Sequence, residues 1–252
     1  MSEQRSKFRV VLACADGDFA RGVASRIKDS RQVEIVGMTE HGEEALRLCE
    51  RTQAELIVLD TELSGADGLT VAFQLRERGS RQNILLISAF QGAQLLLMCK
   101  MLAVEYVLRK PIEVETLVDH LRLQAAAATV QAREQEGERA LRQYLEGLFR
   151  AFELRTGAKS CRYTIEAVCA CRSSNSGLTK EVYPEIARRF GTTPANVERS
   201  IRYLVQKIWH GGNTALLERY FGAERVRRGT HMTNHRFIQA LLEGFAAENR
   251  SE

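Results

Sequence analysis

The sequence predicts two domains of different fold class, an α/β domain with a doubly wound, five-stranded parallel sheet and an all-α domain behind it. In the front half, short apolar runs alternate five times with segments of helical periodicity. In the rear half, two helical segments flank a glycine-containing turn. Charge separates in the same way, because residues 1–124 hold 16 Lys/Arg and 18 Asp/Glu, whereas residues 125–252 carry a net charge of +6. A basic rear half indicates a polyanionic partner for that half alone.

The front half is expected to alternate strands and helices along its whole length. The apolar runs that predict strands are residues 8–15, 33–37, 54–60, 84–88 and 106–108. The segments that predict helices are 19–28, 43–51, 69–78, 93–102 and 114–124. Near-continuous apolar runs are typical of parallel strands buried on both faces, so crossover helices should cover both sides of the sheet.

Four polar residues each end a different predicted strand: Asp16, Asp60, Ser88 and Lys110. Reactive groups of such sheets gather at the carboxyl ends of the strands, so we expect these side chains to meet in one pocket. Two carboxylates can hold Mg²⁺, and Asp60 can attack a phosphoryl group to form an acyl phosphate. Lys110 and the Ser88 hydroxyl would contact phosphate oxygens, with Pro111 fixing the loop through a cis bond. The alternative is that each residue merely ends its strand.

The rear domain is expected to begin near residue 144, after a linker at 125–143 that is alanine-rich, then charged, part helical and broken at Gly137. The front domain then spans residues 1–124 and the rear domain 144–252. An apolar stripe that resumes before this boundary has helical spacing and comprises Leu141, Leu145, Leu148, Phe149 and Phe152. Further helices are predicted at 163–171, 216–220 and 234–246, with a turn at 173–177.

Residues 179–209 predict a helix-turn-helix. Val182, Ile186 and Phe190 share a face of the first helix, and Pro184 is tolerated near its first turn. Gly191 can end that helix in a left-handed conformation, and Thr193-Pro194 is a start signal for the next. The apolar stripe of the second helix is Val197, Ile201, Leu204 and Ile208, and Trp209 at its end is expected to be a core anchor.

The remaining polar residues of the second helix favour DNA binding over an ordinary helical hairpin with a solvated face. Arg199 and Arg202 are the best candidates for base or phosphate contacts, because arginine can bond two acceptors of guanine at once. Glu198 would accept from cytosine or orient a neighbouring arginine. The other candidates are Asn196, Tyr203 and Gln206 for the groove, and Lys180, Lys207 and the basic run 225–228 for phosphates.

Composition excludes several other classes of protein. No apolar run approaches the ~18 residues needed to span a bilayer, and the first eight residues lack the apolar core of a secretion signal, so we expect a cytoplasmic protein. In a reducing compartment the six scattered cysteines are expected to be buried small apolar side chains. Neither Cys169-x-Cys171 nor His231-x3-His235 has a second ligand pair at zinc-site spacing, so no metal site is expected there. The sequence contains neither a nucleophile–base pair nor a glycine-rich nucleotide loop, so we do not expect an enzyme. GADG at 65–68 is too short to be such a loop.

Residues 8–124 resemble the receiver domain of bacterial two-component response regulators, which is a flavodoxin-like fold. The positions that carry the resemblance are Asp16, Asp60, Asp67-Gly68, Ser88-Ala89, Tyr106 and Lys110-Pro111. The resemblance implies that Asp60 is the phosphoacceptor, that Ser88 and Tyr106 form the switch pair, and that Lys110 contacts the phosphate. It implies an Mg²⁺ site at Asp16, Asp60 and Glu62, where Glu62 supplies its backbone carbonyl, and a histidine kinase or phosphotransferase as phosphodonor.

Residues 145–252 resemble the effector domain of the stage 0 sporulation protein A family. The stretches TKEVYPEIARRFGTT, NVERSIRY, WHGGN at 209–213, YFG at 220–222, Thr233-Asn234 and Phe237-Ile238 carry this resemblance. With the recognition helix it leads us to expect a transcription factor that binds double-stranded DNA as a tandem or two-fold pair, and we expect the front domain to control this binding through phosphorylation-linked formation of a homodimer. The basic run 225–228 lies in the segment that resembles the family's polymerase-contacting region, so phosphate and RNA polymerase are both open as its partner.

The front half departs from the receiver pattern at three positions. Ala15 replaces one of two adjacent acids, so Mg²⁺ should bind more weakly, and Asp18 either replaces that acid or is a solvated cap residue. Ser64 stands where a proline is usual, and the Glu62 carboxylate can affect hydrolysis of the acyl phosphate. A receiver that works without phosphate as a dimerisation or docking module is therefore an alternative. A second alternative is a phosphate relay or sink whose rear domain serves protein contacts.

Overall fold

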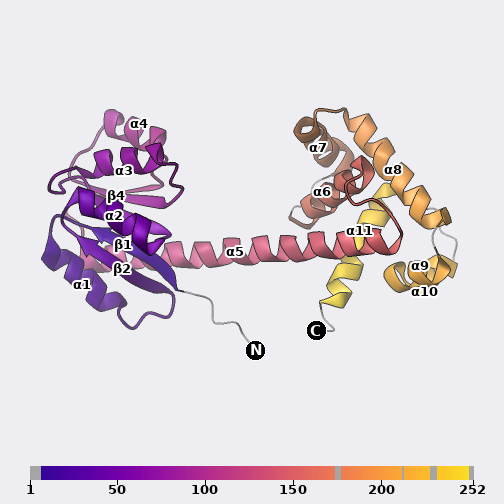
Figure 1. Ribbon diagram of the computed structural model, residues 1–252, viewed down its shortest axis with the longest axis horizontal. Helices are drawn as coiled ribbons and strands as arrows, with labels where there is room; N and C mark the ends of the chain where they lie inside the picture. The colour runs from indigo at the N-terminus through magenta and orange to yellow at the C-terminus, as the bar shows by residue number, and fades with distance from the viewer. Residues whose placement is uncertain (1–6, 174–176, 212, 228–231, 250–252) are drawn as a thin grey trace. The chain divides into compact units, whose positions relative to one another are not determined.

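The apolar runs of the front half form one five-stranded parallel sheet in the computed structural model (Figure 1). The structure describes residues 7–173, 177–211, 213–227 and 232–249, and it divides into two units, 1–132 and 133–252. The strands follow the order β2-β1-β3-β4-β5, with bounds β1 (Phe8–Ala13), β2 (Val33–Thr39), β3 (Leu56–Asp60), β4 (Asn83–Ser88) and β5 (Tyr106–Arg109). The doubly wound fold predicted from the sequence is confirmed.

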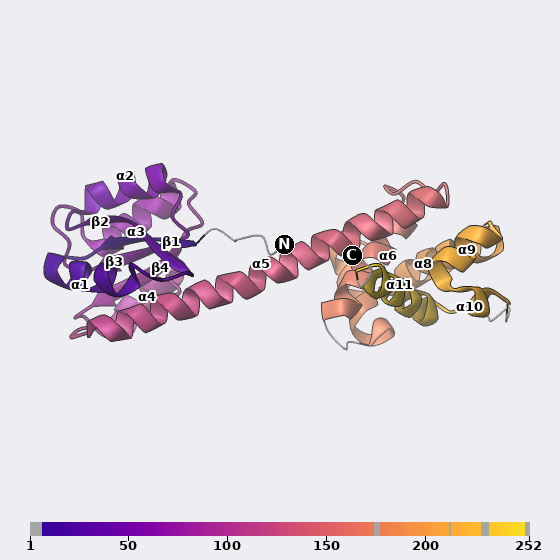
Figure 2. The same ribbon diagram turned by 90° about the horizontal axis from the view of Figure 1, so that it is seen from below.

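Helices cover both faces of the sheet in the first unit (Figures 1 and 2). On one face, α1 (Gly17–Ile27) and the start of α5 (Val114–Ala151) pack on β1, β3 and β4 through residues such as Leu12 and Leu117. On the other face, α2 (Gly42–Thr52), α3 (Gly68–Glu77) and α4 (Ala93–Met101) bury the alternate strand residues, Val11 and Ile57 among them. All five residues of β3 are buried, which explains its uninterrupted apolar sequence.

The guanidinium of Arg76 joins three segments of the chain. Its nitrogens donate at 2.8–3.0 Å to four backbone carbonyls, those of Ser80, Gln82, Leu102 and Ala103. Burial lowers the pKa of Arg76, with Glu105 acting in the opposite direction. The side chain therefore joins the end of α3 to the end of α4 and the approach to β4.

Replacing Arg76 with alanine should lower the free energy of unfolding by about 3 kcal/mol, because several carbonyls lose a charged donor at once. Urea unfolding of the full chain, followed by circular dichroism, measures the change. The matched control is Arg78→Ala at the end of the same helix, where an exposed pair with Glu50 should contribute at most about 1 kcal/mol. Equal effects of the two variants would contradict the role given to Arg76.

Helix α5 is continuous through the stretch expected to be a linker. Its residues Leu117, Val118, Leu121 and Ala125 belong to the core of the first unit, and residues from Leu141 onward belong to the core of the second. The predicted break at Gly137 is wrong. A glycine costs a helix only about 1 kcal/mol relative to alanine, and its neighbours here are strong helix formers. Its missing side chain also leaves room for the guanidinium of Arg172.

The second unit is all-helical, as predicted. Its elements are the end of α5, α6 (Lys159–Ser173), the π-helical turn η1 (Leu178–Val182), α7 (Tyr183–Phe190), α8 (Pro194–Gly211), α9 (Thr214–Phe221), α10 (Ala223–Arg227) and α11 (Asn234–Glu248). Helix α11 crosses the end of α5 (Figure 1), with the rings of Tyr144 and Phe245 5.6 Å apart. Phe149 and Phe237 are fully buried in the core they share with α8.

Most helix boundaries of this unit extend the predicted ones by a few residues. The first helix of the predicted pair starts as the π-helical turn η1, and α8 continues two residues beyond Trp209. Trp209 packs against the core, its ring 5.7 Å from that of Phe221, as expected of an anchor. Residues 174–176 of the predicted turn, His231 and Arg228 lie outside the described residues. Within the described ranges, none of the helices combines the length and apolar character that crossing a bilayer requires.

Candidate functional site

The carboxyl ends of the strands meet at one edge of the sheet and place Asp60 there. Strand register pairs Ala13 with Leu59, Asp60 with Ile87 and Ser88 with Arg109, so the ends of β1, β3, β4 and β5 are level. Asp60 is the last residue of β3 and is 2% exposed. Its Oδ1 accepts from the backbone N–H of Glu62 at 3.0 Å, and its Oδ2 from that of Ala15 at 3.2 Å. The carboxylate is thus held by two loops of the same edge.

Lys110 reaches the same carboxylate from the loop after β5. Its Nζ lies 2.8 Å from Oδ1 of Asp60 and also pairs with the carboxylate of Glu62. Burial works against the charged form, but the hydrogen bonds to Asp60 and Glu62 prevail and raise the pKa of Lys110. The lysine therefore stays charged at neutral pH. The Lys110–Pro111 bond is cis, as predicted.

Ser88 and Tyr106 are placed differently from each other. Ser88 is fully buried, and its Oγ accepts from the backbone N–H of Phe90 at 3.0 Å and from the hydroxyl of Thr61 at 3.3 Å. Tyr106 lies on the edge strand β5 with 43% of its surface exposed. The structure thus brings Ser88 to the interior of the site, next to Thr61, and leaves Tyr106 at the surface. Thr61 gave no signal in the sequence, because a single threonine after a strand is common.

The acids around β1 have other partners. Asp16 caps α1, accepting from the backbone N–H of Phe19 at 3.0 Å. The Asp18 side chain is 92% exposed and pairs with Arg21, so it does not replace the missing acid. The buried thiol of Cys14, the residue after β1, has its pKa raised to about 12, first by burial and then by the charge of Asp60. It is therefore a protonated thiol and not a nucleophile at neutral pH.

The oxygen donors for a metal are few. In the described ranges, no group of three His, Cys, Asp or Glu side chains is arranged to hold a metal ion. The carboxylates of Asp16 and Asp60 and the backbone carbonyl of Glu62 are oxygen ligands of the kind that Mg²⁺ prefers. The Glu62 carboxylate itself is paired with Lys110.

In the second unit, η1, α7 and α8 form the predicted helix-turn-helix. Gly191 ends α7 in the left-handed region with φ 60°, and the hydroxyl of Thr193 accepts from the backbone N–H of Asn196 at 3.3 Å, which caps α8. Pro184 lies in the first turn of α7. The predicted apolar stripe of α8 is buried throughout, together with Val205.

The opposite face of α8 presents polar side chains to solvent. Asn196, Arg199, Tyr203 and Gln206 follow helical spacing and are exposed, Tyr203 to 62%. Lys207 is exposed beside them, and Lys180 is exposed on η1. Glu198 and Arg202 form an ion pair one helical turn apart. The first four residues thus form an exposed polar stripe along α8, and the Glu198–Arg202 pair lies beside it.

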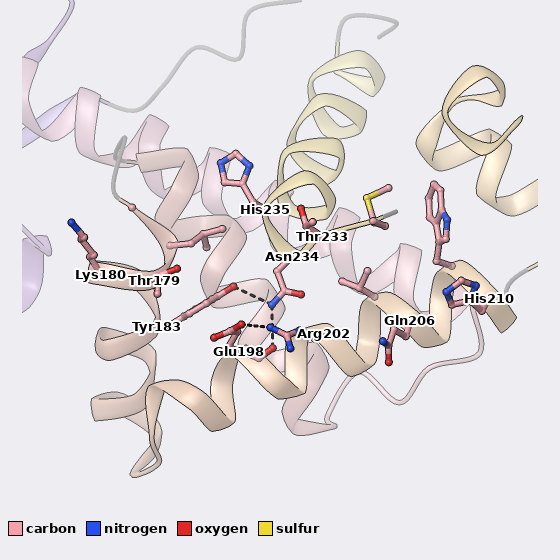
Figure 3. Close-up of a pocket in the computed structure, with 15 residues that line it drawn as sticks. Thr179, Lys180, Tyr183, Glu198, Arg202, Gln206, His210, Thr233, Asn234 and His235 are labelled. Atoms are coloured by element: carbon pink, nitrogen blue, oxygen red, sulfur yellow. Dashed lines mark hydrogen bonds and ion pairs between the residues drawn. The ribbon is translucent and has the colours of Figure 1, made fainter. Parts of the chain in front are cut away.

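A groove of about 840 Å³ runs along α8 between η1 and the start of α11 (Figure 3). Residues of α8 that line it include Glu198, Arg202 and Gln206. The amide of Asn234, which sequence reasoning did not single out as functional, reaches α8 and Tyr183 of α7 here. No local pattern could reveal this, because the contact joins residues 36 and 51 positions apart.

A second contact missed by sequence reasoning joins α5, α6 and α7. The Glu166 carboxylate, 14% exposed, accepts from Arg142 through both oxygens, at 2.9 and 3.2 Å, and from Arg189 at 2.6 Å. The hydrogen bonds of Arg142 to Glu166 and, to a smaller extent, to Glu138 raise the pKa of Arg142 against the opposing effect of burial. The carboxylate ties the first helix of the helix-turn-helix to the end of α5.

Two family models match this chain. Residues 11–122 match the response regulator receiver domain, and residues 153–244 match the family described as "Sporulation initiation factor Spo0A C terminal".

Solved structures resemble the front half of the chain. The receiver domain of the putative response regulator NarL from Mycobacterium tuberculosis is 26% identical, with 48% of this chain and 98% of that one covered and a TM-score of 0.44. A DNA-binding response regulator of the LuxR family from Staphylococcus aureus is 20% identical, with 47% of this chain and 98% of that one covered and a TM-score of 0.43. The receiver domain of AraT, a response regulator from Geobacillus stearothermophilus, is 22% identical, with 52% of this chain and 99% of that one covered and a TM-score of 0.43.

Proposed function

Since this chain is a DNA-binding response regulator of the Spo0A type, with a receiver domain and a Spo0A C-terminal domain, we propose that α8 is its recognition helix and enters the major groove. The observation that carries the proposal is the exposed stripe Asn196, Arg199, Tyr203 and Gln206 opposite a fully buried apolar stripe. Arginine and the amide side chains can each bond two acceptor or donor atoms of one base edge.

The residues around this stripe have supporting roles in the proposal. Arg202 is oriented by its ion pair with Glu198 and contacts a base or a phosphate at the side of the stripe. Lys180 and Lys207 contact phosphates, which position the protein without reading sequence. Arg225 and Arg227 on α10 contact phosphate or RNA polymerase, and Arg225 is paired with Glu243 in the free protein.

The receiver domain, we propose, accepts a phosphoryl group on Asp60 from a histidine kinase or phosphotransferase. A carboxylate oxygen attacks phosphorus, an O–P bond forms, the N–P bond of the donor's phosphohistidine breaks, and the imidazole leaves with the bonding electrons and takes up a proton. Lys110 balances charge on the phosphoryl oxygens after releasing Oδ1, and Ser88 donates to one of them after leaving Thr61. The new charge favours a homodimer that binds paired sites in the cytoplasm.

Receiver domains typically bind Mg²⁺, which neutralises phosphoryl charge. Here Asp16, Asp60 and the carbonyl of Glu62 would hold it. Ala15→Asp restores the second acid of the pair and should raise Mg²⁺ affinity about tenfold, because a further carboxylate increases the negative charge of the site. Isothermal titration calorimetry measures the change. Ala126→Asp, the same substitution on the exposed surface of α5, is the control and should leave affinity unchanged. Equal affinity of Ala15→Asp and the parent would contradict the assignment of these ligands.

Genome-wide pull-down of bound DNA tests the proposed function as a whole. The parent should enrich a shared sequence motif, and Asp60→Ala should enrich the same motif with lower occupancy, because α8 is intact but the dimer is not favoured. Equal occupancy of the two proteins would support the alternative of a phosphate-independent receiver. Enrichment of no motif by either protein would overturn the role given to α8. A relay or sink without DNA binding is not favoured, since the C-terminal domain is a DNA-binding effector.

A further inference from the structure

We propose that Asn234, the first residue of α11, is a positioning residue for the recognition helix, so that the C-terminal helix α11 is part of the unit that reads DNA. The inference rests on the proposed function of α8 and deepens it. It adds a residue that touches no base and acts through the position of α8.

The side-chain amide of Asn234 joins three elements at the groove beside α8 (Figure 3). Its Nδ2 donates to the backbone carbonyl of Glu198 on α8 at 3.1 Å, and to the hydroxyl of Tyr183 on α7 at 3.1 Å. Both bonds are partly buried. Both helices of the helix-turn-helix are therefore attached to the same amide group of α11.

The chemistry of the partners fixes the orientation of this amide. The carbonyl of Glu198 can only accept, so the NH₂ group of Asn234 must face it, and its other N–H faces the Tyr183 hydroxyl. Burial, ahead of the other influences, raises the pKa of Tyr183, which therefore stays a neutral phenol. Tyr183 is 3% exposed and cannot turn away without leaving the core.

The backbone that carries Asn234 is itself anchored. Thr233 caps α11, its hydroxyl accepting from the backbone N–H of Arg236 at 3.3 Å. Phe237 and Ile238, one turn further, are 0% and 2% exposed. The amide thus projects from a fixed helix end, and the bond to Glu198 transmits that position to α8.

A polar contact adds something that the apolar core of α8 does not supply. Hydrophobic burial is non-directional and tolerates small rotations of a helix, whereas a hydrogen bond to one carbonyl restrains both rotation and sliding. Glu198 directly precedes Arg199 and lies one turn before Arg202. The restraint therefore acts on the part of α8 that carries the arginines, where a small rotation would displace a side chain meant to match a base edge.

The experiment compares binding of the full chain to a duplex carrying the enriched motif and to a scrambled duplex, by fluorescence anisotropy. Asn234→Ala should lower affinity for the motif about tenfold and affinity for the scrambled duplex less than twofold, because non-specific binding depends on phosphates. Asn234→Asp should lose at least as much, since its carboxylate keeps the Tyr183 contact but faces the Glu198 carbonyl without a donor. Tyr183→Phe should lose about threefold, because the bond to Glu198 remains.

Asn249→Ala, the same substitution at the exposed far end of α11, is the matched control and should bind both duplexes like the parent. Thermal unfolding of each variant checks that it is folded. Loss of affinity for both duplexes in equal proportion would show a merely structural role and overturn the inference, as would parental binding by all Asn234 and Tyr183 variants. Arg199→Ala, measured in parallel, separates the two proposals. If Arg199→Ala and the Asn234 variants all keep the parent's preference for the motif over the scrambled duplex, the role of α8 fails. If Arg199→Ala loses that preference and the Asn234 variants keep it, only the role of Asn234 fails.

Discussion

Asp60→Asn should abolish covalent uptake of a phosphoryl group by this chain. The amide is nearly isosteric with the carboxylate. Its single oxygen can keep one of the two hydrogen bonds that the Asp60 oxygens accept from the backbone N–H groups of Glu62 and Ala15, and the NH₂ group replaces the other acceptor. The amide lacks the anionic oxygen that attacks phosphorus. Intact mass spectrometry after incubation with a small phosphoramidate donor and Mg²⁺ measures the product directly.

The control for this substitution is Asp67→Asn. Asp67 caps α3 by accepting from the backbone N–H groups of Leu69 and Thr70, a role that asparagine also performs. This variant should be phosphorylated like the parent. Phosphorylation of Asp60→Asn at the parental level would move the acceptor elsewhere, and a parent that takes up no phosphoryl group would support the alternative of a phosphate-independent receiver.

Arg199→Ala should weaken binding to the enriched motif by about 1–3 kcal/mol and relax preference at one base pair. The reason is that an exposed guanidinium on the polar stripe supplies two donors to one base edge, and alanine supplies none. Competition binding with duplexes mutated one position at a time locates the base pair concerned.

Two other substitutions sharpen this result. Lys207→Ala should weaken motif and scrambled duplexes alike and lower the salt slope by roughly one unit, as expected of a phosphate contact. Arg47→Ala removes the same charge from an exposed position on α2 of the receiver domain and should change neither the affinities nor the salt slope. If Arg199→Ala behaved like Lys207→Ala, Arg199 would be a phosphate contact and not a reader of sequence.

The receiver fold could be predicted from sequence because its strands are buried on both faces. Each such strand is an apolar run, and the runs are long enough and evenly enough spaced to reveal a parallel sheet. The level ends of the strands then placed Asp60 and Lys110 together correctly. The prediction was wrong at Gly137, where a local signal was weaker than the helix propensity around it.

The candidate sites were harder to predict in detail, for a physical reason. Helix caps and apolar stripes are local patterns, and the ends of α7 and α8 were accordingly predicted from Gly191 and Thr193. The contacts of Glu166 and Asn234 depend on tertiary packing between helices distant in sequence. Which way Ser88 turns also depended on a neighbour, Thr61, that carries no pattern of its own.

The most direct measurement of the central claim is the affinity of the purified chain for a duplex over a series of salt concentrations. If the stripe on α8 lies in a DNA groove with Lys180 and Lys207 on flanking phosphates, the logarithm of the binding constant should fall linearly as the logarithm of salt concentration rises. Arg199→Ala should keep most of that slope and lose the preference for the motif. Absence of any salt-dependent affinity, for motif and scrambled duplexes alike, would contradict the account.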